Sequence, residues 1–180
     1  MTEHKHLKRL ARVWITDPVF FITTCSHQRQ TILANTQIAK ILVDEWAGAR
    51  ERHGWMVGRY VIMPDHVHFF CAPIRGIAPL DGINDPIYKD LSGFIQQWKQ
   101  WTSKRIIREC NSPNGPSGLR QQFVSPIWQA EFFDHLLRSQ ESYSRKWEYV
   151  HQNPVRKGLV KRVDDWQWQG EIYDLKMSSR

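Results

Sequence analysis

The stretch Tyr-Val-Ile-Met-Pro-Asp-His-Val-His-Phe-Phe, residues 60–70, decides the fold and carries the first candidate site. Pro64 separates two apolar runs that are typical of strands, because proline lacks a backbone N–H. Side chains two residues apart leave the same face of a strand. We therefore expect His66 and His68 on one face and Val67 on the other. Two imidazoles on one rigid strand can bind one metal ion, although the pattern alone is not specific in a chain with eight histidines.

Composition limits the class of protein and the kind of partner. With 180 residues, the chain is long enough for one domain with a sizeable core. A formal charge of +7 and a pI near 9.5 favour a polyanionic partner, most simply nucleic acid. No apolar run approaches the length that spans a bilayer, so no membrane partner is expected. The three cysteines are widely spaced, which argues against a disulfide framework or zinc–cysteine site and predicts a cytoplasmic, nucleoid-associated protein.

Apolar periodicity predicts alternating strands and helices. The expected strands are 19–25, 55–63, 66–72 and 127–137, and the expected helices are 36–52, 90–106 and 140–152. This is the βαββαβ order of a ferredoxin-like α+β fold, followed by an additional C-terminal helix. The order implies an antiparallel sheet with its first two helices on one face and the histidine strand in the centre.

Three segments are expected to lie outside this single domain's regular elements. Residues 1–17 form a basic arm, and residues 110–126 are rich in turn-forming residues and predict a mobile loop. Residues 167–180 form a divergent tail to which no role is given. The arm could contact nucleic acid or simply be a mobile end, and the loop is given no role.

A second candidate site lies on the additional helix. Tyr149 and Asn153 are four residues apart, so a phenol and a carboxamide project from one helix face. If that face covers the histidine strand, His66, His68 and Asn153 supply three neutral ligands and leave open positions for a substrate phosphate. Mg²⁺ or Mn²⁺ suits such a site, and Zn²⁺ is the alternative.

Two stretches resemble one known family. Met-Pro-Asp-His-Val-His-Phe at 63–69 is similar to the HUH motif of single-tyrosine transposases of the insertion-sequence 200-like type. Glu-Tyr-Val-His-Gln-Asn-Pro-Val-Arg-Lys-Gly-Leu-Val at 148–160 resembles their tyrosine helix, with the greatest similarity to the REP-associated tyrosine transposases. The order of the two motifs makes the pair more specific than either one.

The resemblance implies both an activity and a role for each site residue. His66, His68 and Asn153 would bind the divalent metal, and Tyr149 would be the nucleophile. Tyr149 would attack a phosphate of single-stranded DNA near a palindromic REP-type hairpin, which forms a 5′-phosphotyrosine intermediate and frees a 3′-hydroxyl. Family members act as monomers or homodimers, and both states are left open here. The family pattern is variable at Asp65, which is given no role.

Four basic residues are the DNA-binding candidates. Lys99 is expected near the solvent side of the second helix, and the resemblance places a DNA-contacting lysine there. Arg138 ends an Asp-His stretch that also resembles the family. Arg156 and Lys157 follow the tyrosine and could position phosphates.

Two other functions fit the same residues. A metal-dependent nuclease or phosphodiesterase could use the two histidines with an activated water, so that Tyr149 would be dispensable. A basic DNA-binding protein without catalytic activity would need neither the metal site nor the Tyr149 nucleophile. A covalent protein–DNA adduct distinguishes the transposase from both.

Overall fold

The computed structural model describes residues 18–74, 90–112 and 122–175. The predicted arm 1–17, the centre of the predicted loop 110–126 and the end of the tail lie outside these ranges, so the predictions for them stay predictions. The strands are β1 Val19–Cys25, β2 Trp55–Ile62, β3 His66–Pro73, β4 Phe133–Leu137 and β5 Gln169–Glu171. The helices are α1 Thr36–Ala47, α2 Ala49–His53, α3 Leu91–Cys110, α4 Gln140–His151 and α5 Asn153–Arg156, with 3-10 turns at His27–Arg29 and Val163–Asp165.

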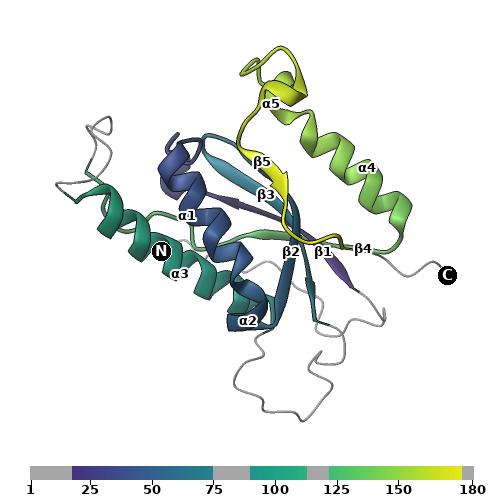
Figure 1. The fold of residues 1–180 in the computed structure, drawn as a ribbon, viewed down its shortest axis with the longest axis horizontal. Coiled ribbons are helices and arrows are strands. Elements are labelled where there is room, and N and C mark those ends of the chain that lie inside the picture. The colour runs from purple at the N-terminus through teal and green to yellow at the C-terminus, as the bar shows by residue number, and fades with distance from the viewer. Residues whose placement is uncertain (1–17, 75–89, 113–121, 176–180) are drawn as a thin grey trace, which may run out of the picture.

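The sheet has the order β4-β1-β3-β2-β5, and every neighbouring pair is antiparallel. Its first four strands, with α1 and α3, give the ferredoxin-like α+β arrangement that the element order predicted. β3 lies between β1 and β2, so the histidine strand is central as expected. Figure 1 shows α1 and α3 on one side of this sheet and α4 on the other.

The core between the sheet and helices α1 and α3 is the largest of the three apolar clusters in the described residues. Alternation along β1 and β3 sends Ile22, Val67 and Phe69 to this side, where all three are buried. The indole rings of Trp46 on α1 and Trp98 on α3 stack with their centroids 5.1 Å apart. This stack joins the two helices over the centre of the sheet and contributes apolar burial that the smaller α4 side does not match.

Local signals set the helix ends. The side chain of Asn35 accepts hydrogen bonds from the backbone N–H groups of Gln37 and Ile38, and that of Asp90 accepts one from Gly93. Gly54 ends α2 in the left-handed region with φ 70°, a conformation that glycine adopts without steric cost. The helix predicted over 36–52 is divided at Gly48 into α1 and α2.

Two predictions about the elements were wrong in detail. The strand predicted over 127–137 begins at Phe133, because the segment before it has one isolated bridge, Ser26 to Trp128, and turns its carbonyls at 129–131 to Lys99 on α3. The helix predicted over 140–152 is confirmed as α4, and Pro154 lies in the first turn of the separate helix α5, where its missing N–H costs no hydrogen bond. The tail contributes a fifth strand that had not been predicted, and β5 pairs with β2.

Within the ranges given above, no helix combines the length and apolar character needed to cross a bilayer.

Candidate active site on the α4 face of the sheet

His66 and His68 lie side by side on the face of β3 that α4 covers, as the alternation predicted. Their ring centroids are 4.7 Å apart and nearly perpendicular. Phe21 on β1 stacks against the ring of His68 with centroids 5.4 Å apart. The two imidazoles are therefore packed on a rigid sheet rather than held by a loop.

A hydrogen bond to Nδ1 orients each imidazole. Oδ1 of Asp65 lies 2.6 Å from Nδ1 of His66, and Oγ1 of Thr23 lies 2.8 Å from Nδ1 of His68. The carboxylate of Asp65 can only accept, so Nδ1 of His66 carries the proton and Nε2 keeps its lone pair. Arg29 holds the other carboxylate oxygen at 2.9 Å, so Asp65 is fixed from both sides.

Asp65 and Thr23 are therefore orienting residues that the sequence analysis missed. Such partners of the second ring nitrogen fix the tautomer of a metal-binding histidine. The signal for Asp65 was its position next to His66, but the signal for Thr23 existed only in the strand register that pairs it with His68.

Burial keeps both imidazoles neutral. It lowers the pKa of His68 to about 3, and the nearby charges of His66, Lys146, Arg29 and Arg156 act in the same direction. Burial also lowers the pKa of His66, although the carboxylate of Asp65 opposes that change. Neutral His66 therefore presents an Nε2 lone pair near pH 7, and neutral His68 does so in the tautomer whose Nδ1–H donates to Thr23. This is the form of an imidazole that binds metal ions.

The two tyrosines of α4 have opposite environments. Tyr143 is 3% exposed, packs on Phe70 with centroids 4.6 Å apart, and has its pKa raised by burial to about 12. Tyr149 is 61% exposed. Tyr149 is thus the tyrosine of this helix that a DNA strand can reach, and Tyr143 is a core residue.

Arg156 connects Tyr149 to Asn153. Its guanidinium lies over the Tyr149 ring, 3.9 Å from the centroid, and donates to the Tyr149 carbonyl at 2.7 Å. It also donates to Oδ1 of Asn153. The amide oxygen that was predicted to bind metal is therefore held by Arg156 in this arrangement, and would have to exchange that partner for a metal ion.

The donor atoms on this face fit a divalent metal. Across the described ranges, no group of three or more His, Cys, Asp or Glu residues could hold a metal ion. A third protein ligand beside the two imidazoles must then be of another type, and the amide oxygen of Asn153 is the candidate. Two nitrogen donors with one neutral oxygen donor suit Mn²⁺ or Zn²⁺, and Mg²⁺ would bind them less tightly.

The structure places the DNA-binding candidates in different environments. Lys99 is only 9% exposed, and its ammonium donates to the carbonyls of Gln129, Ala130 and Glu131 at 2.8, 3.1 and 3.0 Å. The prediction that Lys99 lies near the solvent side of its helix, available to DNA, was wrong, because its charge is satisfied by the segment before β4. Arg138 and Lys157 are exposed, and their DNA contacts stay predictions.

Comparison with known proteins agrees with the two motifs. No protein-family model matches the sequence. The chain is 23% identical to a REP-associated tyrosine transposase of Escherichia coli (strain K12), over 94% of this chain and 95% of that protein. It is 28% identical to a putative REP-associated tyrosine transposase of Haemophilus influenzae, over 64% of this chain and 58% of that protein.

A solved structure shares the fold. It is a REP-associated tyrosine transposase bound to a REP hairpin, 20% identical, with a TM-score of 0.63 over 97% of this chain and 98% of that chain. The relatives confirm the resemblance to REP-associated tyrosine transposases, and the solved structure confirms the fold.

Proposed function

We propose that this protein is a metal-dependent single-stranded DNA transesterase that nicks and rejoins DNA at REP-type hairpins through Tyr149. One observation carries the proposal: an exposed tyrosine stands on the helix that covers two neutral, oriented imidazoles. The names of the relatives support the same reaction class. The hairpin in the similar structure supports the same kind of substrate.

The reaction exchanges one phosphoester bond for another. The phenol oxygen of Tyr149 loses its proton to solvent and attacks the phosphorus, which forms a 5′-phosphotyrosyl bond. The bond from phosphorus to the 3′ oxygen breaks, and that oxygen takes a proton to become a 3′-hydroxyl. Because the number of phosphoester bonds is unchanged, a 3′-hydroxyl can attack the phosphotyrosine and rejoin the strand without ATP.

His66 Nε2, His68 Nε2 and Asn153 Oδ1 would hold a divalent metal, Mg²⁺ or Mn²⁺. When bound, such an ion supplies Lewis-acid stabilisation of the charge on the phosphate oxygens. Asp65 and Thr23 keep the two imidazoles in the ligating orientation. A phosphate that attracts Arg156 would free the Asn153 oxygen, to which the Arg156 guanidinium donates in this structure.

The remaining exposed cations suit backbone binding. Arg138 follows β4, Arg156 ends α5 and Lys157 is its C-cap, so these residues are candidates for contacts with phosphates before and after Tyr149 in the chain order. Such contacts set affinity and register and do not read sequence. Either a monomer or a homodimer is compatible with the proposal.

A denaturing gel tests the function directly. The wild-type protein is incubated with Mn²⁺ and a labelled single-stranded hairpin from the flanks of its own gene. We expect a covalent protein–DNA band with wild type and with Tyr143→Phe, and none with Tyr149→Phe. Cleavage by all three without an adduct would establish the water-using nuclease, and binding without cleavage would establish the non-catalytic protein.

A further inference from the structure

A cavity of about 330 Å³ lies between β4 and the first turns of α4, with Tyr149 on its edge. Its walls include His135 and Leu137 from the sheet, and Arg145, Lys146 and Tyr149 from the helix. The volume is at the lower end of small-molecule sites, which run from roughly 300 to 1,000 Å³. It has room for one nucleotide and not for a hairpin stem.

Lys146 provides the cavity with a positive charge that no carboxylate of the described residues neutralises. The guanidinium of Arg145, the other cation on this wall, pairs with Glu141 one turn earlier. Lys146 forms no ion pair with any carboxylate of the described ranges, and its ammonium lies 5.1 Å from the centroid of the Phe21 ring. The Ser139 and Ser142 side chains are already used in the capping box of α4. An anion in the cavity would therefore meet Lys146 first.

Lys146 also stands between the tyrosine and the histidines. Lys146 and Tyr149 are one helical turn apart and both line the cavity. The Phe21 ring under the ammonium stacks on His68. A strand whose phosphate is bound by Lys146 would thus run past Tyr149 with its next phosphate directed to the histidine face.

We propose that this cavity is a subsite for the nucleotide adjacent to the scissile phosphate, and that Lys146 binds the phosphate of that nucleotide. The inference rests on the proposed function and adds a positioning residue to it. Its role is to fix the register of the strand, so that Tyr149 faces one phosphate and not its neighbour. The nucleotide's sugar and base would lie against His135 and Leu137 on β4.

A scan of the DNA phosphates tests this proposal. A set of hairpin oligonucleotides is made in which one phosphate at a time is replaced by an uncharged methylphosphonate. Binding is measured by fluorescence anisotropy in the Tyr149→Phe background, which prevents cleavage. In that reference we expect one substitution beside the cleavage site to weaken binding about tenfold, as for loss of one charge-assisted contact.

In the Tyr149→Phe background, the additional change Lys146→Ala should weaken binding of the unmodified DNA by the same factor. In this double variant, the methylphosphonate that weakened binding in the reference should have no further effect on affinity. Lys146→Ala should also reduce the slope of log affinity against log salt by about 0.7. Lys146→Arg should restore both the affinity for the unmodified DNA and the salt slope. Lys104→Ala, an exposed lysine on α3, is the matched control and should leave the profile unchanged.

If Lys146→Ala leaves the affinities for the methylphosphonate oligonucleotides in the same pattern, the subsite proposal is overturned. The adduct gel separates the two proposals. If wild type forms the adduct and the profile persists, the subsite alone fails. If wild type forms no adduct but Lys146→Ala silences one phosphate, the transesterase fails and the subsite remains as a DNA-binding site.

Discussion

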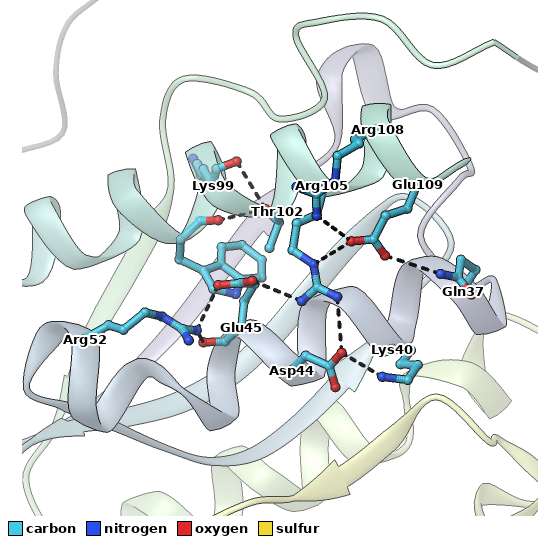
Figure 2. A network of polar contacts seen from close by, with 11 residues as sticks. Gln37, Lys40, Asp44, Glu45, Arg52, Lys99, Thr102, Arg105, Arg108 and Glu109 are labelled. Carbon is cyan, nitrogen blue, oxygen red and sulfur yellow. Dashed lines mark hydrogen bonds and ion pairs between the residues drawn. The ribbon is translucent and has the colours of Figure 1, made fainter. Parts of the chain in front are cut away.

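The α1–α3 face of the sheet has a network of paired charges, and the α4 face has a group of cations that pair with no carboxylate of the described ranges. On the α1–α3 face, Arg105 reaches Glu45 and Glu109 at 3.0 Å and Asp44 at 3.3 Å, and Arg52 also pairs with Glu45. Figure 2 shows this network, which joins α1 to α3 over the core. On the α4 face, Lys146, Arg156 and Lys157 surround the histidine strand, and none of them pairs with a carboxylate of the described ranges.

This difference identifies where a polyanion can bind. Cations that are already paired with carboxylates stabilise the contact between two helices and offer little attraction to DNA. Cations that pair with no carboxylate keep their potential for a phosphate. The net positive charge of the chain therefore predicts a nucleic-acid partner, and the pairing pattern predicts which face that partner meets.

The largest expected effect comes from a change on the α4 face. His68→Ala removes one of the two imidazoles, and we expect the single-turnover rate of DNA cleavage with Mn²⁺ to fall roughly a thousandfold. His53→Asn changes a buried histidine on the other face and should leave the rate unchanged at a temperature where both variants are folded. Equal loss in both variants would mean that stability, and not the site, controls the rate.

Lys99→Met should affect the α1–α3 face and spare DNA binding. The change leaves three carbonyls without their ammonium donor, so we expect the free energy of unfolding to fall by roughly 2–3 kcal/mol in urea titrations. The affinity for the hairpin oligonucleotide should not change. A variant of normal stability with weaker DNA binding would restore the original prediction that Lys99 contacts DNA.

Asp65→Asn and Thr23→Val should weaken metal binding without removing a ligand. Loss of a partner that orients a metal-binding imidazole reduces metal affinity by about 10- to 100-fold. Calorimetric titration with Mn²⁺ measures this effect on each variant, and Thr102→Val, a buried threonine on the other face, serves as the control. Unchanged Mn²⁺ affinity in both variants would show that these hydrogen bonds only stabilise the sheet.

The smallest expected effect is the pH dependence of the α1–α3 network. The hydrogen bond from Arg105 is the main reason that the pKa of Glu109 lies below its usual value of 4.5. The resulting stabilisation is present above that value and is lost as the pH falls through the lower pKa of the folded protein. Between pH 6 and pH 3, wild type should lose up to about 1 kcal/mol more than Arg105→Met, because the pair is partly exposed. If wild type and Arg105→Met lose the same free energy of unfolding between pH 6 and pH 3, the prediction is contradicted.

Much of the fold followed from local patterns in the sequence. The nearly continuous apolar run of β1 and the 3.6-residue period of α1 and α3 predicted those elements. The side chains of Asn35, Asp90 and Ser139 cap the starts of α1, α3 and α4. The two-residue period of β3 also placed both histidines on one face. β5 was missed because it has three residues, one of them Gly170, and no apolar alternation.

The site was predictable only as far as local geometry reaches. The spacing of Tyr149 and Asn153 could be read from the helix, but the contact of Arg156 with both depends on the turn into α5. Lys99 could have been recognised as buried, since positions 95, 99, 102 and 106 form one stripe of α3. The carbonyl groups that accept hydrogen bonds from Lys99 could not be predicted, because they depend on the path of the chain past α3 before β4.

Mass spectrometry of the protein–DNA adduct tests the central claim most directly. Trypsin separates the two tyrosines of α4, with Tyr143 in peptide 139–145 and Tyr149 in peptide 147–156. After nuclease trimming of the adduct, we predict a 5′-phosphonucleotide on Tyr149 in peptide 147–156 and none on Tyr143. A nucleotide attached to any other residue, or cleaved DNA with every peptide unmodified, would contradict the account.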